Sequence, residues 1–117
     1  MEFKKEIPDF KERRNEFERI LNNHPNKIPI ILEPAKKTKN AITIKQNKFL
    51  VPKLFTFHEF LFQVRKRVGL SSGESLYVAV AGFYFPSLDR TMMSIYDEFK
   101  DSDGFLYVNF SSEAVWG

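Results

Sequence analysis

The chain has no cysteine among its 117 residues. This absence excludes a disulfide scaffold, a thiolate zinc site and a catalytic thiol, and it fits a reducing compartment. Long apolar runs are also missing, since no stretch approaches the roughly 20 residues that span a bilayer. The first residues carry charges where a signal peptide would have an apolar stretch. We therefore expect a soluble protein of the cytosol or nucleus.

Motifs for catalysis and for cofactor binding are missing as well. The two histidines, His24 and His58, lie far apart without cysteines nearby, so we expect no metal site. Asp101 to Gly104 faintly resembles a calcium loop but lacks the distal glutamate, which favours a plain turn. No phosphate-binding glycine loop and no nucleophile elbow occur. We predict neither an enzyme nor a bound cofactor.

What the chain does contain is aromatic and basic. Thirteen phenylalanines and four tyrosines predict an aromatic core, and 117 residues suffice for one domain. The net charge is +3, but basic residues concentrate in the N-terminal half while acidic residues dominate from Glu74 to Glu113. Such a basic half suits nucleic acid, an acidic membrane surface or an acidic peptide, or it is an ordinary solvated surface.

Two helices have clear start signals. Asp9 as N-cap, with Glu12 three residues later, predicts a helix over residues 9–23, preceded by a short helical turn. The pair Thr56 and Glu59 predicts a second helix, which Gly69 ends. The buried face of this second helix is predicted from 3, 4 and 7 spacings: Phe57, Phe60, Leu61, Val64 and Val68.

Four strands are predicted around these helices. The β-branched run 28–33 forms the first, and Pro29 within it belongs at a strand start or on an unpaired edge. Residues 42–44 and 48–52 together form the second strand. Residues 76–80 lack charges and predict a central strand. A short helix around residues 92–99 precedes the last strand, 105–110.

This order predicts an α+β protein with the ubiquitin-like β-grasp architecture. A four-stranded mixed sheet surrounds a central helix, with two extra N-terminal helices. A ferredoxin-like fold or another α+β roll fits the same order. We expect one domain over residues 1–117, with a helical extension (1–24), a β-grasp core (25–110) and a flexible tail (111–117).

Two features favour binding over catalysis. Residues 48–51, if they lie at a sheet edge, leave backbone groups to which an extended peptide adds as a further strand. The alternative is that Lys48 only protects this edge against aggregation. The chain also ends at Gly117, and a glycine on an extended tail fits a narrow channel where its carboxylate can be activated.

Four motifs in order along the chain carry a family resemblance. They are Phe10-x-x-Arg13-Arg14-x-Glu16, Lys27-Ile28-Pro29-Ile30-Ile31-x-Glu33, Lys48-Phe49-Leu50-Val51-Pro52 and Phe60-x-Phe62-x-Val64-Arg65-Lys66-Arg67. From about residue 3 to residue 117, the chain resembles the autophagy-related ubiquitin-like modifiers of the GABA-A-receptor-associated-protein and microtubule-associated light-chain type.

The resemblance implies a conjugation cycle. Gly117 would be adenylated, passed as a thioester to cysteines of activating and conjugating enzymes, and joined to phosphatidylethanolamine. A processing and delipidating cysteine protease would complete the cycle. The chain would be a monomeric substrate and adaptor, cytoplasmic or, when lipidated, on the autophagosome membrane. Its partners would be receptors with an acidic aromatic-x-x-aliphatic motif, with microtubules as a further candidate and no nucleic acid.

The resemblance also assigns site residues. The first motif pocket would be formed by Glu16, Ile20, Pro29, Lys48, Leu50 and Phe105. The second would be formed by Val51, Pro52, Phe55, Phe60 and Val64. Lys48 and Arg67 would meet the acidic flank of the motif, and the backbone of residues 48–50 would pair with the added strand.

The chain departs from the family pattern at several positions. Gln63 replaces an aliphatic residue expected in the second pocket, and Ala81-Gly82 replaces a polar pair. The Trp116-Gly117 ending is also similar to the sister autophagy modifier that is conjugated to a protein lysine. That modifier is the alternative reading, and a basic nucleic-acid-binding module is a third.

Overall fold

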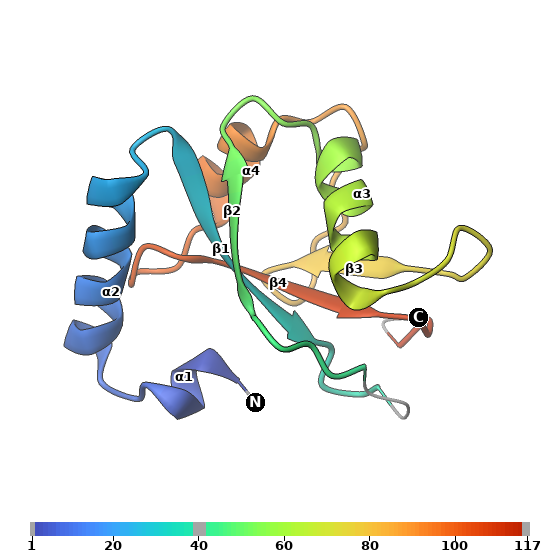
Figure 1. The fold of residues 1–117 in the computed structure, drawn as a ribbon, viewed down its shortest axis with the longest axis horizontal. Coiled ribbons are helices and arrows are strands. Elements are labelled where there is room, and N and C mark those ends of the chain that lie inside the picture. The colour runs from blue at the N-terminus through green and yellow to red at the C-terminus, as the bar shows by residue number, and fades with distance from the viewer. Residues whose placement is uncertain (1, 39–41, 116–117) are drawn as a thin grey trace.

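The computed structural model describes residues 2–38 and 42–115 and contains four helices and four strands within them. Figure 1 shows their arrangement. The helices are α1 (Phe3–Glu6), α2 (Phe10–Asn23), α3 (Phe57–Val68) and α4 (Met92–Phe99). The strands are β1 (Lys27–Pro34), β2 (Lys48–Pro52), β3 (Tyr77–Val80) and β4 (Leu106–Ser111).

The four strands form one mixed sheet in the order β2-β1-β4-β3. The central strands β1 and β4 are parallel, and each edge strand is antiparallel to its neighbour. The predicted four-stranded mixed sheet and the two N-terminal helices are therefore confirmed. Residues 48–51 lie in the edge strand β2, so the condition stated above for strand addition is met.

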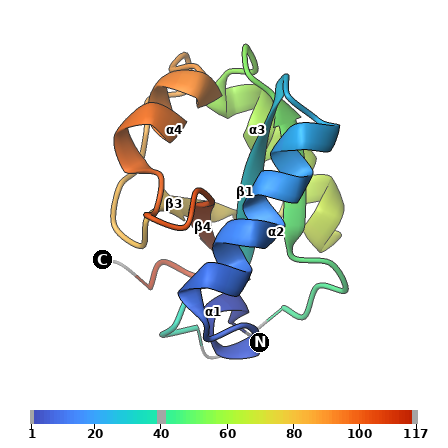
Figure 2. The same cartoon turned by 90° about the vertical axis from the view of Figure 1, so that its left-hand side faces the viewer.

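Helices pack on both faces of the sheet, because side chains alternate along each strand. On one face, Ile28, Ile30 and Leu32 of β1 pack with residues of α3 and α4 in the main core. On the other face, Ile31 and Phe105 pack with Phe3 of α1 and Phe17 of α2. Figure 2 views the molecule from this second face, with α1 and α2 in front of the sheet.

The helix starts follow the predicted capping. The Asp9 side chain accepts a hydrogen bond from the Glu12 backbone N–H at 3.3 Å. Thr56 and Glu59 form a complete capping box, in which each side chain binds the other residue's backbone N–H. Gly69 ends α3 in the left-handed conformation, with φ of 78°.

Two predictions about the strands need correction. Residues 42–47 are not in a strand, so the second strand consists of β2 alone. β3 is an edge strand and not a central one. Val78, Ala79 and Val80 are buried because both faces of the strand are covered. The apolar composition of a strand therefore indicates that its faces are buried, but it does not indicate whether the strand has a hydrogen-bonded neighbour on both sides.

The remaining differences concern Pro29 and the end of β4. Pro29 lies inside the central strand β1. The pairing of β1 with β4 begins one residue later, at Ile30 with Leu106. No hydrogen bond of the β1–β4 ladder therefore requires an N–H group at Pro29. β4 extends to Ser111, whose side chain is buried and bonded to Thr38, one residue beyond the predicted strand end.

A buried ion pair joins α2 to the turn before β4. Arg13 Nε donates to Asp103 Oδ2 at 3.0 Å, and both residues are buried. Asp103 also accepts hydrogen bonds from the Tyr107 hydroxyl and the Phe105 backbone N–H. Burial, together with this bond to Asp103, raises the pKa of Tyr107 above its usual range. The network holds α2 against the sheet.

Gly104 in the same turn is fixed by space and by backbone geometry. Its φ is 99°, and a Cβ atom there would lie 2.4 Å from the Phe17 ring. Only glycine lets α2 approach the turn this closely. None of the helices within the described ranges is both long and apolar enough to cross a membrane.

Candidate functional site

The free edge of β2 presents backbone groups at alternate residues. The Leu32 N–H donates to the Asn47 carbonyl at 2.7 Å, which makes residues 32 and 47 a hydrogen-bonded pair in register with the β1–β2 ladder. Because such pairs alternate along an antiparallel ladder, Phe49 bonds to β1 while Lys48 and Leu50 direct their backbone groups away from it. The outer edge therefore offers the N–H and C=O groups of Lys48 and Leu50.

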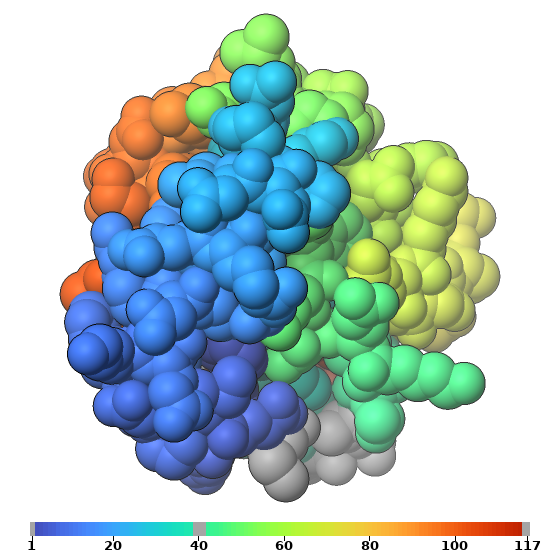
Figure 3. Space-filling model, turned by 60° about the vertical axis from the view of Figure 1, so that its left-hand side comes forward, coloured from blue at the N-terminus to red at the C-terminus, as the bar shows by residue number. Residues whose placement is uncertain are grey.

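The side chains of β2 divide between the two faces of the sheet. Phe49 and Val51 are buried toward α3, whereas Lys48 and Leu50 are more exposed and lie on the α2 face. Figure 3 shows this part of the surface, where blue side chains of α2 meet green ones of β2 and α3. The free edge of β2 is therefore bordered by α2 on one face of the sheet and by α3 on the other.

All six residues predicted for the first pocket line one cavity of about 280 Å³ on the α2 face. They come from four parts of the chain: α2, β1, β2 and the residue before β4. Pro29 and Leu50 are register partners, so they place the floor of the cavity directly beside the free edge. The further lining residues are Arg19, Asn23, His24, Ile30, Gln46 and Phe49.

The rim of this cavity is a charged triad. Glu16 Oε1 lies 2.6 Å from Lys48 Nζ and 2.6 Å from Arg19 Nη2. The hydrogen bonds from Arg19 and then Lys48 hold the pKa of Glu16 below its usual range. One carboxylate between two cations leaves a net positive rim, which suits an anionic partner.

The Glu16 triad predicts a titration that NMR can follow. Since the pKa of Glu16 is lowered, its stabilising contribution is present at neutral pH and is lost as the pH falls through the lowered folded-state pKa. We expect the Glu16 carboxyl carbon to titrate below an ordinary glutamate, and Arg19→Ala and Lys48→Ala each to raise its midpoint. An unchanged Glu16 midpoint in both variants would contradict this electrostatic description.

Arg67 occupies the edge that a peptide would need. Its Nη1 donates to the carbonyls of Gln46 and Lys48 at 3.1 Å each, and its guanidinium lies 4.3 Å from the Phe49 ring centre. The Lys48 carbonyl is one of the outward groups, so an added strand would have to share it with Arg67 or displace it. No local pattern predicts these bonds, because they depend on the packing of α3 against β2.

The residues predicted for the second pocket lie on the α3 face, but three of them are inaccessible. Val51, Phe60 and Val64 are at most 1% exposed and belong to the main core. Pro52 and Phe55 are half-buried and Gln63 is partly exposed, so they form the accessible surface there. The second pocket stays a prediction, with the three core residues as support beneath it.

Two further sequence predictions concern chemistry elsewhere. Gly117 lies outside the described residues. Among residues 2–38 and 42–115, no group of three or more histidine, aspartate and glutamate side chains is placed to hold a metal ion.

Comparison with known proteins gives consistent matches over nearly the whole chain. Residues 12–117 match the family model described as "Autophagy protein Atg8 ubiquitin like". Autophagy-related protein 8 of Coccidioides immitis is 40% identical over 115 residues, covering 98% of this chain and 96% of that protein. The Mycosarcoma maydis protein of the same name is 39% identical over 108 residues, covering 92% and 90%.

A solved structure agrees with these sequence matches. The crystal structure of Trypanosoma brucei ATG8 superposes with a TM-score of 0.83 at 32% identity. The match covers 95% of this chain and 94% of that one.

Proposed function

The chain belongs to the Atg8 family of ubiquitin-like autophagy proteins, and on that premise we propose that it is a membrane-tethered adaptor for receptors carrying an acidic aromatic-x-x-aliphatic motif. It would be the substrate of a conjugation pathway and not a catalyst. Its docking element would be the free edge of β2.

The observation that carries the proposal is the meeting of the free β2 edge with the cavity on the α2 face. Lys48 and Leu50 supply outward backbone groups for an added strand, and the same two residues line the cavity. A peptide strand paired here places one side chain in that cavity without any change of register. The Glu16 triad lies at the cavity rim, beside the acidic flank of such a motif.

The geometry of a strand explains the spacing in the motif. Successive side chains point to opposite faces, so residues three apart lie on opposite sides of the sheet. The aromatic residue would enter the cavity on the α2 face, and the aliphatic one would contact Pro52 and Phe55 on the α3 face. Lys48 and Arg67 would meet the acidic residues.

This spacing argument gives a direct prediction. A peptide with one residue inserted between the aromatic and aliphatic positions places both side chains on one face of the added strand. We expect it to bind at least about tenfold more weakly than the parent peptide, corresponding to 1.4 kcal/mol or more. Calorimetric titration of both peptides, matched in charge and composition, measures the difference. Equal affinities would remove strand addition as the binding mode.

We also propose that Gly117 is the acyl donor of the chain. Its carboxylate would react with ATP to give an acyl adenylate and pyrophosphate, and an enzyme thiol would displace AMP to form a thioester. The amine of phosphatidylethanolamine would then release the thiol and form an amide. The family match supports this proposal, as does the absence of any cysteine nucleophile in the chain itself.

Gly117→Ala tests the conjugation step in cells undergoing autophagy. We expect no membrane-bound conjugate from this variant, whereas Lys48→Glu should still be conjugated because it alters only the docking edge. A membrane-bound form of Gly117→Ala would contradict the proposal. Mass spectrometry of the wild-type conjugate should show an ethanolamine-lipid adduct, and an isopeptide remnant on a lysine would instead identify the sister modifier.

A further inference from the structure

The last strand ends in a buried serine hydroxyl. Ser111 is 1% exposed, and by alternation along β4 it shares a face of the sheet with Tyr107 and Asn109. Its Oγ accepts two hydrogen bonds, one from the Thr38 hydroxyl at 3.2 Å and one from the Glu113 backbone N–H at 2.9 Å. A buried hydroxyl needs such partners, because leaving it unpaired costs free energy. We call these two bonds the Ser111 latch.

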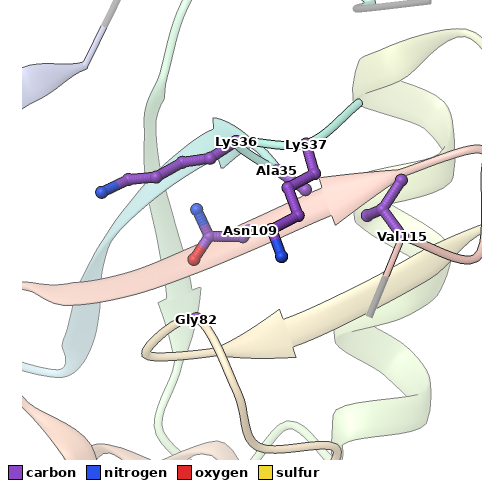
Figure 4. Close-up of a pocket in the computed structure, with 6 residues that line it drawn as sticks. All are labelled: Ala35, Lys36, Lys37, Gly82, Asn109 and Val115. Atoms are coloured by element: carbon purple, nitrogen blue, oxygen red, sulfur yellow. The ribbon is translucent and has the colours of Figure 1, made fainter. Parts of the chain in front are cut away.

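Beyond Ser111 the chain does not continue as an extended segment. The bond from the Glu113 N–H to the Ser111 side chain closes a serine turn, and the Val115 N–H donates to the Glu113 carbonyl at 2.9 Å. Val115 lines a hollow of about 430 Å³ together with Asn109 and residues 35–37. Figure 4 shows these residues around the hollow. The described part of the tail is thus folded back toward the turn that follows β1.

That turn is itself bonded to the end of β4. The Ala35 N–H donates to the Phe110 carbonyl at 2.8 Å, and the Thr38 N–H donates to the Ala35 carbonyl at 3.2 Å. These bonds hold the Thr38 backbone beside Ser111, so forming the bond between the two hydroxyls orders few further groups. The latch therefore belongs to the packed part of the fold, although the tail that it restrains begins there.

The proposed activation of Gly117 requires a tail of the opposite shape. A narrow enzyme channel admits a glycine at the end of an extended segment, and residues 112–117 reach about 20 Å only when no turn shortens them. We propose that Ser111 is a positioning residue of this reaction, whose hydroxyl holds the tail folded back until the latch opens for the activating enzyme. The inference rests on the proposed conjugation of Gly117. Ser111 touches no reacting atom and acts only through the direction of the tail.

The two states of the tail predict a specific kinetic effect. The enzyme binds the open state, so its apparent affinity for the chain is reduced by the fraction of molecules in which the Ser111 latch is open. Once bound, the tail is extended in every variant, and the adenylation step is the same. Loss of the latch therefore lowers KM and leaves kcat unaltered, whereas general damage to the fold would raise KM or lower kcat.

Exchange of pyrophosphate into ATP by the activating enzyme measures this effect, because it reports adenylate formation. Ser111→Ala removes the acceptor of both bonds, and we expect it to lower the KM for the chain about two- to tenfold, the range that one hydrogen bond contributes. The control Ser112→Ala removes the neighbouring hydroxyl, which takes no part in the latch, and should leave KM unchanged. An unchanged or higher KM of Ser111→Ala overturns the proposal.

The partner hydroxyl tests the same latch from the other side. Thr38→Val keeps the shape of the side chain but removes the donor, so we expect a smaller decrease in KM. Thr38→Ser keeps the hydroxyl and should retain the wild-type KM. Added to Ser111→Ala, Thr38→Val should have no further effect, because both substitutions act through the same oxygen atom. Additive effects would show that the two hydroxyls act separately and would overturn the latch.

Two measurements on the free chain report the latch without any enzyme. Ser111→Ala should speed amide exchange at Glu113, and in time-resolved anisotropy it should enlarge the nanosecond depolarisation of Trp116, the single tryptophan. Circular dichroism checks that the variant is folded. Unchanged exchange and depolarisation overturn the latch. An absence of pyrophosphate exchange with the wild-type chain would instead contradict the proposed conjugation, and the two measurements would still decide whether Ser111 restrains the tail.

Discussion

Asp103→Ala is expected to lower the free energy of unfolding by about 3–5 kcal/mol, because it leaves the buried Arg13 guanidinium without its counter-charge. Asp103 is fully buried and accepts bonds from Arg13, Tyr107 and the Phe105 backbone. The alanine removes all of these acceptors at once, and a buried unpaired donor costs more than the bond itself contributed. Urea denaturation followed by circular dichroism measures the loss.

The effect should also reach the docking cavity. Arg13 donates to the carbonyls of Ile7 and Pro8 as well, so it ties the segment between α1 and α2 to the turn before β4. Helix α2 carries Glu16 and Ile20 of the cavity wall. The control is Glu18→Ala, which breaks the exposed pair with Arg14 and should cost at most about 0.5 kcal/mol. Similar losses in the two variants would show that the buried pair is not a stabilising contact.

Lys48→Glu is expected to weaken binding of an acidic aromatic-x-x-aliphatic peptide at least about 30-fold, or 2 kcal/mol. The ammonium group of Lys48 lies 2.6 Å from Glu16, so the substituted carboxylate would lie beside Glu16 at the cavity rim. It would also face the acidic flank of the peptide. Like charges at an interface disfavour the complex by several kcal/mol.

The matched control keeps the charge and changes the shape. Lys48→Arg should retain affinity within about threefold, because the rim stays positive. Circular dichroism checks that both variants are folded, which is expected since Lys48 is about one-third exposed. Equal affinities of the glutamate variant and the wild type would place the acidic flank elsewhere.

The elements with strong local signals could be predicted from sequence. The capping box at Thr56 and the left-handed Gly69 define α3 through contacts within a few residues, so α3 needed no tertiary information. The six residues of the first pocket came from family motifs, and the structure brings all six to one cavity. Local pattern alone could not have joined Glu16 to Phe105.

What the sequence did not reveal depends on long-range packing. Arg13 and Asp103 are 90 residues apart, and neither has a local signal for burial. The position of β3 was predicted wrongly because an apolar strand with both faces covered looks the same at the edge and in the centre. For Phe60 and Val64 two predictions conflicted: the core spacing on α3 predicted burial, whereas the resemblance assigned both residues to the second pocket. The structure buries both side chains, as the spacing predicted.

Amide hydrogen exchange of β2, with and without the motif peptide, tests strand addition most directly. In the free protein, the outward N–H groups of Lys48 and Leu50 should exchange fast, whereas those of Phe49 and Val51 are protected by bonds to β1. We expect the peptide to slow exchange at Leu50 and leave Phe49 and Val51 unchanged. Bound peptide without new protection at Leu50, or with protection at the β3 edge instead, would contradict docking on β2.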